Sequence, residues 1–165
     1  MMLDRLSRTA RWIALIAPAL LLGGAYLSQY GFGLVPCEMC WWQRYPHFAA
    51  LALALLAFVI PRAARPLTVL AALAILASGL IGGFHAGVEW GWWPGPSHCT
   101  VSASTGGDAL SRIMNTPLVR CDVAQWRFAG LSLAAWNFIA SSAAAIAIAL
   151  CLISGQRASG RRATR

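Results

Sequence analysis

The chain has 165 residues, of which 59% are hydrophobic, and its charged side chains are thirteen arginines and five acids. This composition excludes an ordinary soluble domain, in which about one residue in four is charged. A net charge of +8 is also typical of nucleic-acid-binding proteins, but most of these arginines flank apolar segments. We therefore expect a single integral-membrane domain over residues 1–165, surrounded by the lipid bilayer and without a nucleic-acid partner.

Four apolar segments are each close to the ~20 residues that a transmembrane helix needs. In chain order they cover about residues 12–30, 41–60, 67–88 and 128–153. The second reaches spanning length only if Trp41 and Trp42 lie at the membrane interface, where tryptophan is favoured. Because lipid offers no hydrogen-bond partners to the backbone, the segments are predicted to be helices. The expected fold is all-α, a four-transmembrane-helix bundle with two longer loops, at about 31–40 and 89–127.

The arginines predict the orientation of this bundle. Nine of the thirteen precede the first segment, lie in the turn at 61–66 or follow the last segment, whereas four of the five acids lie on the opposite side. The positive-inside rule then places both termini in the cytoplasm and the two longer loops outside it. The N-terminal segment also has features of a signal peptide. Because Tyr26, Gln29 and Tyr30 interrupt any cleavage site, we expect the segment to be retained as a helix.

The two outward loops contain four of the five cysteines: Cys37 and Cys40 in the first, Cys99 and Cys121 in the second. Disulfides are expected outside the cytoplasm, and four cysteines allow three pairings. Cys37 and Cys40 form a C-x-x-C motif, whose ring is too small to stabilise a fold by much and whose usual role is thiol exchange. Two purely structural disulfides and a four-thiolate zinc site are the alternatives. Cys151, on the other side, is expected to be a small apolar core residue.

Three polar residues follow the motif at helical spacing. If Cys40 begins a helix, Cys40, Arg44 and His47 lie on one face of it. The helix N-terminus favours a Cys40 thiolate, and Arg44 adds a permanent cation. His85 is predicted at a similar depth on the third segment. An exchangeable dithiol beside these groups at the lipid boundary predicts electron transfer to a lipid-soluble acceptor. A haem-b electron carrier with His47 and His85 as iron ligands is an alternative of another class.

These features resemble the bacterial disulfide bond formation protein B (DsbB) family. The resemblance covers about residues 14–152 and is carried by P-C-E-M-C-W-W-Q-R, by C-D-V-A-Q-W-R-F-A-G-L-S and by the four predicted helices. It implies a quinone-dependent, disulfide-generating oxidoreductase of the bacterial inner membrane, with its active loops in the periplasm. The implied partner is a periplasmic thioredoxin-like thiol:disulfide oxidase (DsbA-like), and the implied cofactor is ubiquinone, with menaquinone possible and no metal. A vitamin K epoxide reductase-like protein is a further alternative, but in that family the loop cysteines precede the C-x-x-C.

The resemblance also implies roles for the four outward cysteines. Cys99 and Cys121 would form the loop disulfide that the partner attacks, with the mixed disulfide on Cys99. This pair would exchange with Cys37–Cys40, where Cys37 accepts the attack and Cys40 passes electrons to the quinone.

Three further residues are predicted at the quinone. Arg44 and His85 match family residues beside the ring, and His47 shares the helix face of Arg44. Arg44 stabilises negative charge but cannot donate a proton, whereas His85 titrates near neutral pH and could donate one. A short surface helix capped by Asp108 is also predicted within the second loop.

Overall fold

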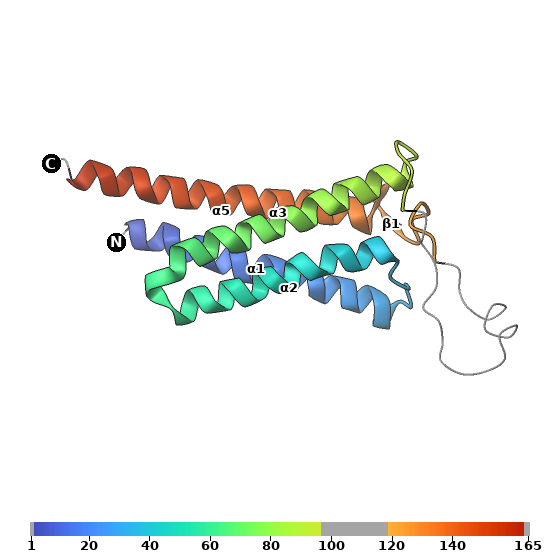
Figure 1. Ribbon diagram of the computed structural model, residues 1–165, viewed down its shortest axis with the longest axis horizontal. Helices are drawn as coiled ribbons and strands as arrows, with labels where there is room; N and C mark the ends of the chain where they lie inside the picture. The colour runs from blue at the N-terminus through green and yellow to red at the C-terminus, as the bar shows by residue number, and fades with distance from the viewer. Residues whose placement is uncertain (1, 97–118, 164–165) are drawn as a thin grey trace, which may run out of the picture.

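The computed structural model describes residues 2–96 and 119–163. Long helices dominate this part of the chain: α1 (Met2–Gly31), α2 (Glu38–Val59), α3 (Ala64–Glu89) and α5 (Leu133–Ala163). A short 3-10 helix, η1 (Pro61–Ala63), joins α2 to α3 (Figure 1). The predictions for Cys99 and for the short helix at Asp108 lie outside the described residues.

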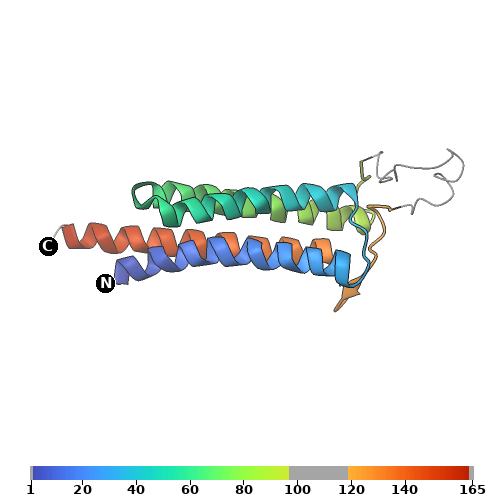
Figure 2. The same ribbon diagram turned by 90° about the horizontal axis from the view of Figure 1, so that it is seen from below.

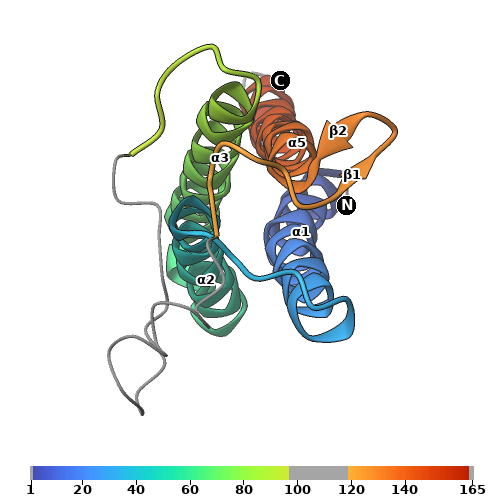
Figure 3. The same cartoon turned by 90° about the vertical axis from the view of Figure 1, so that its right-hand side faces the viewer.

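The long helices form an antiparallel bundle. Viewed from one end, α1, α2, α3 and α5 surround a common centre, and each packs mainly against two neighbours, with a smaller contact between α1 and α3 (Figure 3). The two termini and η1 lie at one end of the bundle, and the connections from α1 to α2 and from α3 to α5 lie at the other (Figures 1 and 2). The core is built mainly from alanine and isoleucine: Ala10, Ala14, Ala50, Ala54, Ala71, Ile75, Ala145 and Ile148. Small side chains let the helix backbones approach closely, as in many membrane bundles.

Within the part of the chain that the structure describes, three helical stretches are long and apolar enough to cross a membrane. These spans are Arg5–Gly31, Pro61–Glu89 and Leu133–Gln156. Leucine and other apolar side chains face outward along them, as lipid contact requires. The chain is therefore a multi-pass membrane protein. Helix α2 is long enough but less apolar, because Gln43, Arg44 and His47 lie in its first half, all buried in the bundle.

The segment before α5 differs from the prediction. A helix was expected from residue 128, but Arg127–Phe128 (β1) and Leu131–Ser132 (β2) form an antiparallel hairpin. Its two turn residues, Ala129 and Gly130, have φ angles of 51° and 81°, which suit a two-residue turn with both residues in the left-handed region. The all-α prediction is wrong at this hairpin, and α5 begins only at Leu133.

Candidate redox site at the loop end of the bundle

Cys37 and Cys40 lie at the start of α2. Cys37 is the N-cap residue, and its sulfur accepts a hydrogen bond from the Cys40 backbone N–H at 3.3 Å. Both thiols are free, and the Cys37 Sγ donates to the Cys40 Sγ at 3.0 Å. This hydrogen bond to Cys40, together with burial, raises the pKa of the Cys37 thiol. The pair is therefore arranged with its proton on Cys37 and with Cys40 at the positive end of a helix, where a thiolate is favoured.

Cys121 approaches this dithiol from the second loop. It is buried and disulfide-bonded. The Sγ atoms of Cys37 and Cys121 and a ring nitrogen of His85 all lie within 4.8 Å of one another. Three such atoms could also hold a metal ion, but a disulfide sulfur is not the thiolate that zinc binds. The proximity brings a thiol close to a disulfide, which is the arrangement that exchange requires.

His85 lies between the two cysteine segments. Its Nε2 is 3.2 Å from the Cys121 carbonyl oxygen, 3.7 Å from the Cys37 Sγ and 3.7 Å from Glu89 Oε1. Its Nδ1 lies 2.9 Å from Gln43 Nε2. Both ring nitrogens thus have protein partners, and haem ligation by His85 would require one of these contacts to break. This arrangement disfavours the haem alternative.

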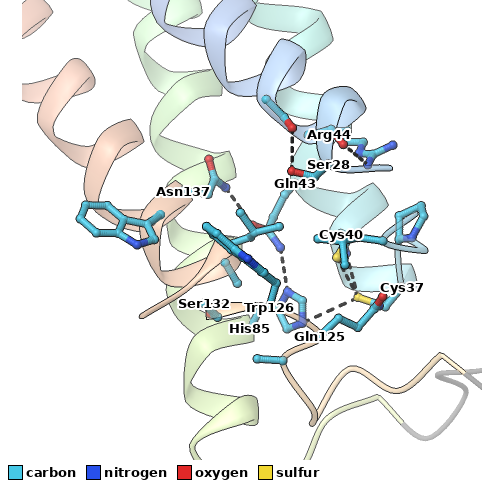
Figure 4. A pocket seen from close by; sticks show the side chains of 18 of the residues that line it. Ser28, Cys37, Cys40, Gln43, Arg44, His85, Gln125, Trp126, Ser132 and Asn137 are labelled. Carbon is cyan, nitrogen blue, oxygen red and sulfur yellow. Dashed lines mark hydrogen bonds between the residues drawn. The ribbon is translucent and has the colours of Figure 1, made fainter. Parts of the chain in front are cut away.

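Gln43 and Asn137, which we call the amide pair, connect His85 to His47. Gln43 Nε2 donates to the Met39 carbonyl at 3.1 Å, and Gln43 Oε1 accepts from Asn137 Nδ2 at 2.9 Å. Asn137 Oδ1 lies 3.0 Å from His47 Nε2. Figure 4 shows His85, Gln43 and Asn137 of this series. A buried chain of hydrogen bonds thus runs from the dithiol into the bundle. Connected hydrogen bonds of this kind hold the side chains that they join in one geometry.

Arg44 is buried and bound to α1. Its guanidinium donates to Gln29 Oε1 at 2.6 Å and to the Ala25 carbonyl at 3.2 Å. The same group lies 4.8 Å from the ring centroids of Tyr26 and of Trp41, which is cation–π distance. Arg44 is therefore held rigidly in the wall of the site by helix α1.

A cavity of about 270 Å³ joins these groups. Five residues predicted from the sequence line it: Cys37, Cys40, Arg44, His47 and His85. All of these except His47 are labelled in Figure 4. The rest of its wall includes apolar side chains from α1 and α5, among them Leu20, Leu21, Leu22, Leu133 and Trp136. A flat ring with polar oxygens and an apolar tail fits such a lining, with the oxygens toward the polar groups. Cys121 does not line the cavity, but its carbonyl oxygen lies 3.2 Å from His85 Nε2.

A side-chain contact ties the two loops together beside the site. Gln125 Oε1 accepts from the Val35 N–H at 3.1 Å, and Gln125 Nε2 donates to the Val35 carbonyl at 2.6 Å. Val35 precedes Cys37 by two residues, and Gln125 follows Cys121 by four. We call this contact the loop clamp, because it joins the backbone of one cysteine segment to a side chain of the other.

The family model for the disulfide bond formation protein DsbB matches residues 7–151. The chain belongs to the DsbB family. A disulfide bond formation protein B from Verminephrobacter eiseniae is 35% identical, with 94% of this chain and 91% of the relative covered. One from Polaromonas is 34% identical, covering 88% and 89%, and one from Xanthomonas oryzae is 32% identical, covering 77% and 79%. No solved structure matches the chain at comparable significance.

Membership of the DsbB family confirms the resemblance seen in the sequence. It identifies the chain as a membrane oxidoreductase of disulfide bond formation. The vitamin K epoxide reductase-like alternative, which the order of the cysteines already opposed, is replaced by this family.

Four polar residues of this DsbB-family site were missed by reasoning from the sequence. Asn137 is an isolated amide in an apolar helix, which is a signal of function in membranes. Gln43 and Gln125 stand inside the quoted motifs, but their contacts depend on how the helices and loops meet. In the sequence, Glu89 was counted only among the acids on the outer side of the membrane, and no role in the site was predicted for it. Its side chain is 5% exposed, and Oε2 has no hydrogen-bond partner among the described residues.

Proposed function

We propose that this DsbB-family chain is a thiol:quinone oxidoreductase. It reoxidises a periplasmic thioredoxin-like dithiol oxidase by disulfide exchange and passes the electrons to a membrane quinone, either ubiquinone or menaquinone. The observation that carries the proposal is the meeting of two redox segments at one cavity. Cys37 lies within 4.8 Å of the disulfide sulfur of Cys121, and Cys40 lines an apolar cavity beside Arg44.

The proposed orientation follows from the charges at the two ends of the bundle. Nine of the thirteen arginines belong to the termini and the η1 turn, which lie at the same end of the molecule (Figure 1). The positive-inside rule supports a cytoplasmic position for that end and a periplasmic position for the redox site. Helix α2 would then be the fourth span, with its polar first half shielded by its neighbours.

Electrons would enter through the second loop. A dithiol of the partner attacks the disulfide formed by Cys99 and Cys121, and the mixed disulfide forms on Cys99. The released thiolate of Cys121 then attacks Cys37 of the Cys37–Cys40 pair in its oxidised, disulfide form. A Cys37–Cys121 bond forms, the Cys37–Cys40 bond breaks, and Cys40 becomes the thiolate nearest the cavity. In each exchange one sulfur–sulfur bond forms as another breaks, so the electron pair moves inward without a further reagent.

A bound quinone would supply the final acceptor for two electrons and two protons. Such an acceptor is needed because the periplasmic oxidant DsbA has a potential near −120 mV, and each 30 mV corresponds to about 1.4 kcal/mol for two electrons. The DsbA–DsbB–quinone relay is the known example of this chemistry. In this chain, Arg44 is placed to stabilise negative charge on Cys40 or on a ligand oxygen, because guanidinium stays protonated.

The proposal is tested with purified protein in liposomes and a reduced thioredoxin-like partner. Beyond the oxidising equivalents that the protein's own disulfides supply, we expect the partner's thiols to be lost only when ubiquinone is present, at up to one disulfide per quinone. Cys40→Ser should abolish this loss, whereas Cys151→Ser should not, because Cys151 lies far along α5 in the apolar core cluster. Oxidation of the partner at the same rate without quinone would contradict the proposal.

A further inference from the structure

His47 has a buried ring nitrogen that the protein does not use. The residue is 3% exposed and lines the cavity. Its Nδ1 has no hydrogen-bond partner among the residues that the structure describes. Leaving a buried polar atom unpaired is unfavourable, so such an atom beside a cavity indicates a ligand contact.

Two backbone carbonyls determine which nitrogen of His47 carries hydrogen. The Met39 and Ser78 carbonyls can only accept, and they face Gln43 Nε2 at 3.1 Å and Asn137 Nδ2 at 3.2 Å. The side-chain amides of the amide pair therefore cannot be flipped, because a flip would place each amide oxygen against a backbone carbonyl oxygen. Asn137 then presents Oδ1 to His47 Nε2 at 3.0 Å. Since an oxygen only accepts, the hydrogen is on Nε2 and the unused Nδ1 carries a lone pair.

The same amide pair leaves His85 without a free nitrogen. Gln43 Nε2 directs an N–H at His85 Nδ1, at 2.9 Å. The other nitrogen, Nε2, faces the Cys121 carbonyl at 3.2 Å and must be the donor. His85 is thus a fixed hydrogen-bond donor that holds the Cys121 segment. Of the two histidines in the cavity wall, His47 is the one with a nitrogen available for a proton.

We propose that His47 carries a proton to the quinone through Nδ1. The inference rests on the proposed function, and it assigns the source of one of the two protons that reduction of the quinone takes up. Oxidation of the Cys37–Cys40 dithiol to a disulfide releases two electrons and two protons, and reduction of a quinone to a quinol takes up the same. One proton binds His47 Nδ1; this N–H bond then breaks as an O–H bond forms on the quinone oxygen, and His47 returns to its neutral form.

The other ionisable groups of the described cavity wall are less suited to this step. Arg44 cannot release a proton, and the proton of Cys37 is itself one of those to be moved. Glu89 also has an unpartnered oxygen, so it is the rival carrier. The titratable and charged groups that face the cavity, besides His47, are Cys37, Cys40, Arg44, His85, Glu89 and Arg120.

Nitrogen NMR of protein labelled in its histidine rings tests the inference in detergent micelles. His47→Gln keeps a donor at the position of Nε2 but has no atom equivalent to Nδ1. Ser141→Ala is the matched control, because it removes the hydroxyl that donates to Asn137 Oδ1 at 2.9 Å and leaves Nδ1 unchanged. Glu89→Gln tests the rival. Rates of quinone reduction by the prereduced Cys37–Cys40 dithiol are measured on the same four proteins.

We expect the parent to show His47 with hydrogen on Nε2 and a bare Nδ1, whose signal shifts when a short-chain ubiquinone is added. His47→Gln should slow quinone reduction by about 100-fold, the lower limit typical of general acid–base catalysis, with little change in Ser141→Ala and a smaller loss in Glu89→Gln than in His47→Gln. Hydrogen on Nδ1 in the parent, or parent-like rates in His47→Gln, would overturn the inference and leave the proposed function intact. If the parent itself failed to reduce the quinone, the proposed function and this inference would fall together.

Discussion

The loop clamp between Gln125 and Val35 makes a quantitative prediction about disulfide exchange. Gln125→Ala removes hydrogen bonds of 3.1 and 2.6 Å, each worth about 0.5–1.5 kcal/mol net. Because Gln125 is exposed to solvent, we take about 1–2 kcal/mol for the pair. If this free energy is lost in the approach of Cys121 to Cys37, the exchange slows roughly 5- to 30-fold.

The assay isolates that step in a Cys40→Ser background. There the free thiol of Cys37 attacks the disulfide sulfur of Cys121, and the new Cys37–Cys121 linkage accumulates. Mass spectrometry of quenched, digested samples follows its formation over time. Gln125→Ala should slow formation of the linkage without changing the amount of folded protein.

Asp122→Asn is the control for a general disturbance of the second loop. It breaks an exposed ion pair with Arg120 in the same segment, and such pairs contribute about 0–1 kcal/mol. We expect its exchange rate to stay within about fivefold of the parent and above that of Gln125→Ala. A parent-like rate in Gln125→Ala, or equal slowing in both variants, would refute the clamp as the contact that aligns the cysteines.

Two other predictions concern packing and thiol reactivity. In Gly87→Ala the new Cβ would clash with the ring of Trp93, so we expect a lower thermal unfolding temperature. Gly23→Ala, with nothing within 4 Å of its Cβ, should match or exceed the parent. Equal temperatures would contradict this packing. The raised pKa of Cys37 leaves less thiolate at any given pH, so iodoacetamide should modify Cys37 more slowly than Cys40 between about pH 7 and pH 9. Mass spectrometry of the reduced protein checks the order, and faster modification of Cys37 would contradict it.

The helices could be predicted from the sequence because bilayer thickness dictates the length of an apolar segment. The hairpin before α5 could not, because Phe128–Ser132 continues the apolar pattern of the helix that follows. Its signal is Gly130 at a left-handed position, and this signal is weak because Ala129 precedes it in place of the usual asparagine or aspartate. The start of α5 is therefore set by turn geometry, which hydrophobicity does not report.

In the candidate site, too, some residues could be predicted from the sequence and others could not. Cys37, Cys40 and Arg44 could be chosen by residue type and spacing, and the structure brings them to one cavity. The contacts of Arg44 with α1 could not be predicted, because they depend on how α1 and α2 are rotated against each other. The amide pair was missed for the same reason, since Gln43 and Asn137 are 94 positions apart in the chain.

Stopped-flow absorbance tests the central claim most directly. Protein containing ubiquinone is mixed with a reduced thioredoxin-like partner while the quinone band and the Soret region are recorded together. The account predicts loss of the quinone band in proportion to partner thiols oxidised, no Soret absorption, and no loss of the band in Cys40→Ser. An unchanged quinone band while the partner is oxidised would contradict it, and a Soret band would restore haem chemistry at His47 and His85.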